Sequence, residues 1–295
     1  MTRTLLAATD FSAPARHALE RAALIAQAHA DTRLLLAHVV SASLLDQLHH
    51  LAPGESEPIE SSLRTQAERN LAELTDHLAG RYRIAVDATI AQGSPLDSLP
   101  GLLETHQAQL LVMGARGAHF VRELLLGSTT ERVLRKSHRP LLAVKQRPQT
   151  AYRRILAAVD FSPHAAAAIN AAHAWLPDAD FILLHAFEVA LEPTFRLAGM
   201  AEERIHAYRA QAREAAKAQM EAFIATLDVP PHRITREFVH GAPTQRIVEY
   251  EQNLDADLIV MGKRGLTLVE ELLLGSVVQH VLSYSSCDVF VASRR

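Results

Sequence analysis

A glycine-rich motif occurs twice in the sequence, and its residue types suit the binding of phosphate. In the first copy, Gly114-Ala-Arg-Gly117 is followed after nine residues by Gly127-Ser128. Glycines let the backbone approach a ligand closely and adopt positive φ, which exposes successive N–H groups as a concave anion site. Arg116 adds a guanidinium that could pair with phosphate oxygens. The motif therefore indicates a site for a phosphate-bearing ligand.

The second copy repeats the same residue types at the same spacing: Gly262, Arg264, Gly265, Gly275 and Ser276. Each motif lies between an apolar run and a helical pattern, and the N–H groups and dipole of a helix start attract phosphate. An alternative stays open, because Ser128 to Glu131 and Ser276 to Gln279 also fit capping boxes that need no ligand. Capping leaves the glycines and the arginine unexplained. The spacing fits neither a Walker loop nor a dinucleotide fingerprint.

Two aspartates, Asp10 and Asp160, end the first apolar run of each copy. If the runs are parallel strands, both carboxylates face the same crevice as the glycines. There they could accept hydrogen bonds from a ribose or adenine, or hold Mg²⁺ through water. The alternative is a polar cap on the following helix, a role for which Ser12 and Ser162 also qualify.

The elements that position these residues are themselves duplicated. Segments 111–128 and 259–276 are identical at twelve of 18 aligned positions, and segments 5–12 and 155–162 also match. A length of 295 residues fits two domains of about 150 residues. We therefore predict two copies of one domain, 1–148 and 149–295. The polar linker around 145–152 is so short that it predicts contact between the halves.

Within each copy, short apolar runs alternate with longer helical patterns. In the first copy the predicted strands are 4–9, 33–40, 84–90, 109–113 and 140–144, and the predicted helices are 13–30, 58–79, 94–105 and 128–137. The second copy follows the same plan, with a long helix near 200–226. This alternation predicts an α/β fold, a doubly wound parallel sheet with helices on both faces. Such sheets bind ligands beyond the carboxyl ends of the strands, where strand order reverses.

Composition narrows the class of protein. Hydrophobic residues make up 48% and charged residues 21%, and the net charge is −3, as in ordinary globular chains with no cationic field for nucleic acid. The single cysteine, Cys287, cannot form an intramolecular disulfide. No stretch reaches the 18 or so apolar residues of a membrane span. We expect a soluble cytoplasmic protein that binds neither nucleic acid nor membranes.

Three motifs together carry a family resemblance that covers almost the whole chain. Asp-Phe-Ser at 10–12, Leu-x-His-Val at 36–39 and Met-Gly-x-Arg-Gly-x9-Gly-Ser at 113–128 resemble the universal stress protein family. The similarity is to its ATP-binding branch in a tandem two-domain form. It implies five-stranded, adenine nucleotide alpha hydrolase-like sheets of order 3-2-1-4-5, with ATP between strands one and four. It also implies pairing of the domains through the last strands, 140–144 and 288–292.

The resemblance also implies roles for individual residues. In the first copy, Asp10 would contact the adenosine and Val39 the adenine. Met113, Gly114, Arg116 and Gly117 would line the path from the base to the phosphates. Gly127, Ser128 and Thr130 would contact the phosphates. The corresponding residues of the second copy are Asp160, Ala186, Met261, Gly262, Arg264, Gly265, Gly275 and Ser276. The second copy departs from the first at Ala186, in place of the valine, and at Val278, in place of the threonine. Both changes predict a weaker second site.

Other groups of residues give weaker indications of function. His49 and His50 lie in a variable region but have no partners at zinc-ligand spacing, so no metal site is predicted. His38 and His185 close equivalent strands and are interpreted as hydrogen-bonded structural residues. No catalytic constellation is evident.

We therefore expect an ATP-binding stress-response or regulatory protein. A slow Mg²⁺-dependent ATPase using Asp10 or Asp160 and a nucleotide-free interaction scaffold stay open as alternatives. The sequence does not identify the protein partner or the stress signal, and it leaves open whether one or both sites fill and whether the chain forms a homodimer.

Overall fold

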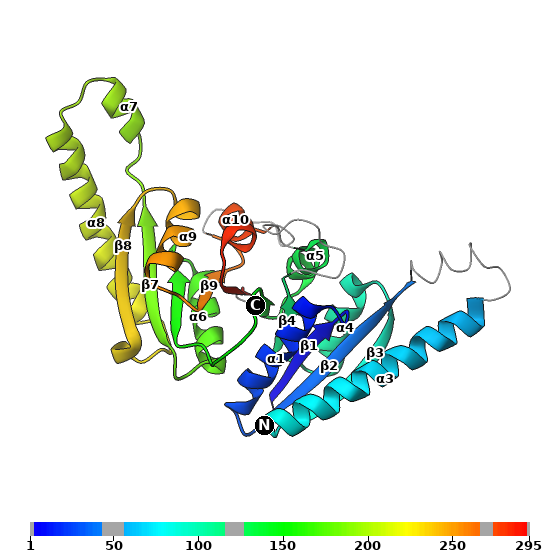
Figure 1. Cartoon of the computed structure of the whole chain (residues 1–295). Helices are drawn as coiled ribbons and strands as arrows, with labels where there is room; N and C mark the ends of the chain where they lie inside the picture. Colours follow the sequence, from blue (N-terminus) through cyan, green and yellow to red (C-terminus); the bar gives the residue numbers. More distant parts are fainter. Residues whose placement is uncertain (1–2, 43–55, 116–126, 266–273, 294–295) are drawn as a thin grey trace. The chain divides into compact units, whose positions relative to one another are not determined.

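The computed structural model describes residues 3–42, 56–115, 127–265 and 274–293, and all structural statements below concern these ranges. The chain divides into two compact units, Met1–Ala151 and Tyr152–Arg295 (Figure 1). Each unit is described by itself. No helix in the described ranges combines the length and the apolar character that crossing a bilayer requires.

The first unit is built on five parallel strands in the order β3-β2-β1-β4-β5. Their bounds are β1 Arg3–Thr9, β2 Thr32–Ser41, β3 Ala85–Gly93, β4 Leu110–Gly114 and β5 Leu141–Val144. The register pairs Leu6 of β1 with Leu35 of β2 on one side and with Leu111 of β4 on the other. The predicted order 3-2-1-4-5 is confirmed, and strand order reverses between β1 and β4.

The helices of the first unit cover both faces of its sheet. They are α1 Ala13–Gln27, α3 Ser56–Tyr82, α4 Pro95–Thr105 and α5 Ser128–Lys136. The helices α1 and α3 contact each other and one face of the sheet, while α4 and α5 pack together. Ser12 and Ser94 are N-caps whose hydroxyls accept hydrogen bonds from backbone N–H groups, and a proline follows each within the first turn. These signals fix where α1 and α4 begin.

The second unit repeats this plan, with parallel strands in the order β10-β9-β6-β7-β8. Its strands are β6 Arg154–Ala158, β7 Asp180–Phe187, β8 Ile234–His240, β9 Leu258–Gly262 and β10 Asp288–Ala292. Its helices are α6 Pro163–Trp175, α7 Glu192–Leu197, α8 Glu202–Ile224, η1 Pro231–Arg233, α9 Pro243–Asn253 and α10 Ser276–Tyr284. Renumbered from its own first strand, the order is again 3-2-1-4-5.

The central strands of both units form their cores. Every residue of β4, β5 and β10 is buried, and so is most of β1 and β9. Because helices cover both faces, the middle residues of these strands are apolar without polar alternation. Polar side chains lie where the strands begin and end, and the candidate site lies at their carboxyl ends.

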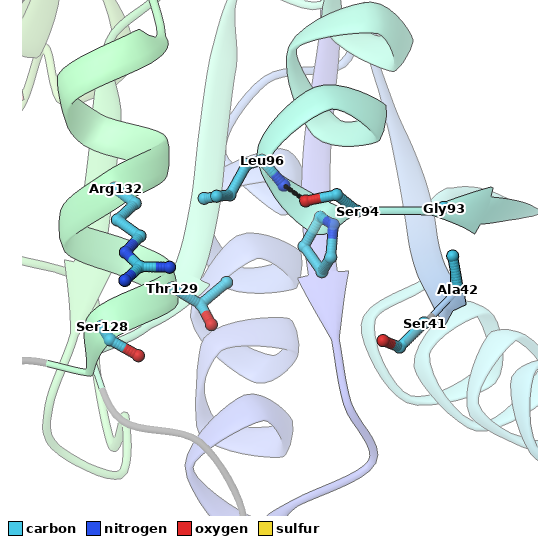
Figure 2. A pocket seen from close by; sticks show the side chains of 9 residues that line it. Ser41, Ala42, Gly93, Ser94, Leu96, Ser128, Thr129 and Arg132 are labelled. Carbon is cyan, nitrogen blue, oxygen red and sulfur yellow. Dashed lines mark hydrogen bonds between the residues drawn. The ribbon is translucent and has the colours of Figure 1, made fainter. Parts of the chain in front are cut away.

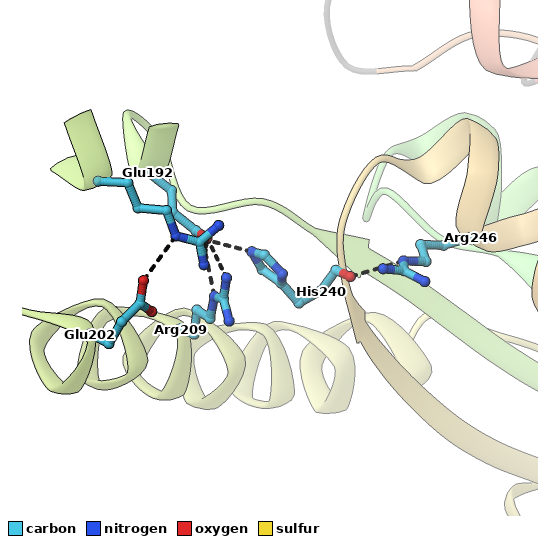
Figure 3. Close-up of polar contacts among 6 residues, drawn as sticks. Glu192, Glu202, Arg209, His240 and Arg246 are labelled. Carbon is cyan, nitrogen blue, oxygen red and sulfur yellow. Dashed lines mark hydrogen bonds and ion pairs between the residues drawn. The ribbon is translucent and has the colours of Figure 1, made fainter. Parts of the chain in front are cut away.

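The short helix α7 was not predicted from the sequence, and tertiary ion pairs hold it. Its first residue, Glu192, is 6% exposed and accepts two hydrogen bonds from Arg209 of α8. The Nε2 atom of His240, the last residue of β8, lies 2.9 Å from Glu192 Oε2 (Figure 3). Arg196, one turn along α7, lies 3.2 Å from the same carboxylate. The hydrogen bonds from Arg209, with smaller contributions from the neighbouring charges, hold the pKa of Glu192 down at about 2.

Candidate functional site

A pocket of about 210 Å³ lies at the carboxyl ends of β6 and β9, where strand order reverses in the second unit. Its lining comes from β6, β7, β9, the start of α9 and the start of α10. All eight residues predicted from the second copy lie in this lining: Asp160, Ala186, Met261, Gly262, Arg264, Gly265, Gly275 and Ser276. The fold thus brings together residues from five separated segments.

The Asp160 carboxylate lies beside the glycine motif. Its Oδ1 atom accepts a hydrogen bond from the Ser162 N–H at 3.0 Å. A Cβ atom built on Gly265 would lie 3.0 Å from Asp160 Oδ2, so glycine at 265 leaves this oxygen room. The helix α6 is capped instead by Ser162, whose Oγ accepts from the Ala165 N–H at 3.1 Å. The sequence left open whether the aspartate or the serine caps the following helix. The serine is the cap in both units, since Ser12 caps α1 in the same way.

An unusual backbone conformation follows each aspartate. Phe11 and Phe161 have φ values of 64° and 62°, in the left-handed region that bulky side chains rarely adopt. The Phe161 ring lies on His185, with ring centroids 4.3 Å apart, and the Phe11 ring lies on His38 at 4.4 Å. Strained backbone of this kind persists where the surrounding packing imposes it, and it concentrates at functional sites.

His185 lines the pocket as a neutral, hydrogen-bonded ring. Burial lowers its pKa below the ordinary value, and this outweighs the Val159 carbonyl and the Asp160 charge, which raise it. Its Nδ1 atom lies 2.8 Å from Val159 O, an acceptor, so Nδ1 carries the proton and Nε2 can accept a hydrogen bond. His38 Nδ1 likewise lies 2.9 Å from Thr9 O. The prediction that both histidines are hydrogen-bonded is confirmed.

The motif glycines of the pocket serve different purposes. At Gly262 a Cβ atom would lie 2.9 Å from the backbone carbon of His164, so glycine is needed to pack β9 against α6. At Gly275 a Cβ atom would meet protein atoms only at 3.7 Å and beyond, and its φ of −61° suits any residue. Neither packing nor conformation explains the glycine there.

Among the described glycines, positive φ occurs at Gly93, Gly199 and Gly241, which lie outside the motif. The motif glycine Gly117 lies outside the described residues. The capping boxes, the alternative that the sequence left open, are not formed. The N-caps of α5 and α10 are Gly127 and Gly275, and neither helix has a side-chain cap hydrogen bond. Ser128 and Ser276 come one position later, as the first residue of each helix, where their side chains are exposed. With this one-residue shift, the first N–H groups of both helices lack the side-chain acceptor that a capping box supplies.

In the first unit, a pocket of about 230 Å³ lies between the starts of α4 and α5 and the ends of β2 and β3 (Figure 2). Its lining is Ser41, Ala42, Gly93, Ser94, Pro95, Leu96, Ser128, Thr129 and Arg132. Ser128 is the one predicted residue in this set. Sequence reasoning missed Ser41, Ser94, Thr129 and Arg132. A partial signal existed, because Gly93-Ser-Pro95 matches Gly241-Ala-Pro243 in the other copy.

The remaining predicted residues of the first copy lie at the same edge of the sheet. Asp10 follows β1 and is exposed, Val39 lies near the end of β2, and Met113 and Gly114 end β4. The predicted Arg116 and Gly117 lie outside the described residues. Thr130 is buried, and its Oγ1 donates to Gly114 O at 2.9 Å, so this hydroxyl joins α5 to the end of β4.

In the described ranges, no group of three or more His, Cys, Asp or Glu side chains is arranged to hold a metal ion. His49 and His50 lie outside those ranges. Asp160 therefore stands as a single carboxylate within the second pocket.

Comparison with known proteins identifies the family of this chain. The model of the universal stress protein family matches residues 1–145 and again residues 151–293. The chain belongs to the universal stress protein family. The two matches make it a tandem member, and the family is a nucleotide-binding stress-response family.

The relatives named below match about half of the chain, whereas solved structures match its whole length. A universal stress protein of Methanocaldococcus jannaschii is 31% identical over 156 residues, 49% of this chain and 96% of the relative. One from Thermus aquaticus is 35% identical over 142 residues, 48% of this chain and 98% of the relative. The crystal structure of a universal stress protein from Archaeoglobus fulgidus covers 99% of this chain and 98% of its own, with a TM-score of 0.70 and 22% identity. This last likeness shows the fold.

Proposed function

We propose that this universal stress protein binds adenine nucleotides, ATP foremost, at the carboxyl ends of its two sheets. Binding would change its contacts with a protein partner during a stress response. The observation that carries the proposal is the second-unit pocket, which gathers all eight predicted residues from segments spread over more than a hundred positions. Pockets at the point of strand reversal are where open α/β sheets hold their ligands.

The chemistry of the lining suits each part of an adenine nucleotide. Asp160 Oδ2 would accept a hydrogen bond from a ribose hydroxyl. Ala186 and Met261 offer apolar surface to the base. Arg264 would pair with a phosphate, and Ser276 with the N–H groups at the start of α10 would bind its oxygens. In the first unit the matching roles fall to Asp10, Val39, Met113, Gly114, Arg116, Gly117, Gly127 and Ser128.

Two features of α10 support a phosphate rather than capping alone. Its N-cap is a glycine without a side-chain hydrogen bond, so the first N–H groups have no side-chain acceptor. The space above Gly275 is large enough for a Cβ atom, yet the sequence keeps glycine there. Close approach of a ligand would give that glycine a reason beyond its place as the N-cap of α10.

The test is extraction of nucleotide from the freshly purified chain, followed by calorimetric titration with ATP in the presence of Mg²⁺. We expect adenine nucleotide to be released on denaturation, or taken up at micromolar concentration when added. An empty chain that also fails to bind adenosine, AMP or ATP at that concentration would refute the proposal.

A further inference from the structure

His240, the last residue of β8, makes polar contacts in two directions (Figure 3). On one side, its Nε2 atom lies 2.9 Å from Oε2 of Glu192, the first residue of α7. On the other side, its backbone carbonyl accepts a hydrogen bond from Nε of Arg246, in α9, at 3.0 Å. A single residue thus joins α7 to α9.

The α9 side of this junction reaches the second pocket. Pro243 and Ile247 line the pocket, and Ile247 directly follows Arg246 in the chain. The hydrogen bond from Arg246 depends on Gly241, whose φ of 129° is one that side chains rarely adopt. A Cβ atom at Gly241 would lie 2.7 Å from Arg246 Nε and would displace the guanidinium. The backbone here therefore keeps the end of β8 against the pocket wall formed by α9.

The end of β7 connects the pocket to His240 a second time. Ala186 lines the pocket, and the ring of the next residue, Phe187, lies against the His240 ring with centroids 5.7 Å apart. The Phe187 carbonyl also accepts a hydrogen bond from the Gly241 N–H at 2.9 Å. His240 is therefore held by the two elements, β7 and α9, that form neighbouring walls of the pocket.

On its other side, His240 holds the segment that contains α7, which we call the arm (residues 188–201). Figure 1 shows α7 beside the start of α8, beyond the carboxyl ends of β7 and β8. Arg196 and Arg209 also contact the Glu192 carboxylate, but they belong to α7 and α8 themselves. Of these three contacts, the one with His240 ties the carboxylate to the sheet. Because Glu192 is buried, loss of a partner for its charge is costly.

The arm presents apolar side chains to solvent. Leu197 is 90% exposed and Leu191 is 64% exposed. A shift of the arm would therefore move exposed apolar surface, which is the kind of change that another protein can detect.

The first unit has a weaker form of the same junction. Gln92, which ends β3, donates from Nε2 to Glu60 Oε1 of α3 at 2.6 Å, and its carbonyl accepts from Ser98 Oγ at 3.4 Å. Both contacts are exposed, and neither joins two charges. In the second unit, the corresponding contacts involve a buried carboxylate and a guanidinium. The junction can therefore hold its partner segment more firmly in the second unit.

Building on the proposed nucleotide binding, we infer that a ligand in the second pocket and the contact between His240 and Glu192 stabilise each other. A base in contact with Ala186 and Ile247 fixes the ends of β7 and α9, and with them the position of His240. In the empty pocket these ends are freer, and the arm is held less firmly. The arm is thus the part of the second unit that reports whether the pocket is filled.

The experiment is hydrogen exchange of the full chain, followed by mass spectrometry, at increasing concentrations of ATP with Mg²⁺. Protection of α9 against ATP concentration gives the Kd of the second pocket, since α9 lines that pocket and not the first one. We expect ATP to slow exchange in α7 about fivefold or more, although α7 does not line the pocket. Protection of α9 without any change in α7 would overturn the inference.

Two variants test the coupling from the other side. His240→Phe keeps a ring beside Phe187 but removes the contact with Glu192, and Glu192→Gln removes the charge while keeping the side-chain size. Because coupling between two sites is reciprocal, each variant should weaken ATP binding at the second pocket about fivefold or more. In each, ATP should also no longer slow exchange in α7. A merely structural role of the pair would not make α7 exchange depend on ATP.

Glu214→Gln is the matched control. It also removes one carboxylate from an ion pair on α8, with Lys217 at 2.7 Å, but this pair is exposed and lies outside the junction. We expect wild-type affinity and a wild-type response of α7 in this variant. Wild-type ATP affinity in both folded junction variants, His240→Phe and Glu192→Gln, would contradict the inference.

The two proposals fail in different ways. If adenosine, AMP and ATP all leave α9 unprotected, the proposed function of the second pocket falls and the inference with it. If ATP protects α9 but neither the variants nor the ligand couple α7 to the pocket, nucleotide binding stands and only the role of the arm is refuted.

Discussion

Replacing Gly275 with alanine separates a ligand-binding role of this glycine from a structural one. The alanine Cβ would lie 3.7 Å from Lys263 O, 3.8 Å from Val278 Cγ2 and 3.9 Å from Arg264 Cα, all ordinary contacts. The φ of −61° is comfortable for alanine. The free energy of unfolding should therefore change little.

The size of that change follows from two opposing effects. Alanine restricts the unfolded chain more than glycine, which stabilises the fold by about 0.4–1 kcal/mol. Alanine is a poorer N-cap than glycine, which costs roughly 0.5–1 kcal/mol. We expect a net change within about 0.5 kcal/mol and a melting temperature within ~2 °C of the wild type.

Ligand binding should respond much more strongly. A Cβ at 275 would occupy the space in which, under the proposed function, a phosphate oxygen would approach the first N–H groups of α10. Loss of one hydrogen bond to a charged group costs about 1.5–3 kcal/mol, or roughly a 10- to 100-fold rise in Kd. Titration of the second-unit site with AMP measures this rise, and thermal denaturation measures stability in parallel.

Gly262→Ala is the matched control within the same motif. Its Cβ would lie 2.9 Å from a backbone carbon and 3.0 Å from a backbone nitrogen of α6, neither of which can rotate away. We expect a stability loss of about 1–3 kcal/mol from overpacking. A Gly275→Ala variant that binds AMP with wild-type affinity would refute the close-approach argument. A Gly275→Ala variant as unstable as Gly262→Ala would refute the packing analysis.

Three further predictions concern other residues of the second unit. Asp160→Asn should keep the hydrogen bond from the Ser162 N–H, so we expect an unchanged melting temperature but roughly tenfold weaker AMP binding in calorimetry, from the loss of a charged hydrogen bond; equal affinity would remove Asp160 from the site. Phe161→Gly should relieve the left-handed strain but lose the ring contact with His185, for a net destabilisation of about 1–3 kcal/mol by chemical denaturation; a stabilised variant would show that strain dominates. For Glu192, a pKa of about 2 in the folded state lies below its ordinary 4.5, so the ionised carboxylate stabilises the fold above pH ~4.5 and this contribution is lost as the pH falls toward 2. Wild type should exceed Glu192→Gln in stability by about 1–2 kcal/mol at pH 7, allowing for solvent screening of the pairs, and the gap should close between pH 5 and 2; a gap independent of pH would contradict the assignment.

The fold could be predicted because the sequence encodes it locally. The strands that the sequence predicted are apolar runs such as Leu110–Gly114, and the structure places them in the predicted order. Helix starts such as those after Ser12 and Ser162 were also evident, because serine and proline carry strong N-terminal signals. These features depend on a few neighbouring residues.

The details that prediction missed depend on contacts between distant segments. A six-residue helix such as α7 has little stability of its own and exists through the ion pairs of Glu192. The choice of Gly275 rather than Ser276 as N-cap shifts the helix start by one residue, which the motif does not specify. Arg132 enters a pocket only because α4 and α5 begin side by side, and the inward turn of the Thr130 hydroxyl to Gly114 is likewise tertiary.

The sharp change from apolar strand to polar strand end has a consequence for how a duplicated chain can diverge. The two copies keep nearly the same residues in the buried strands β4 and β9, as in Val112-Met-Gly114 and Val260-Met-Gly262. Pairs in which the copies differ, such as Thr129 with Val277 and Arg132 with His280, lie on the first two turns of a helix. Changes at these positions leave the sheet intact. Two copies joined in one chain can therefore acquire separate ligand preferences by point substitution, while both keep the same fold.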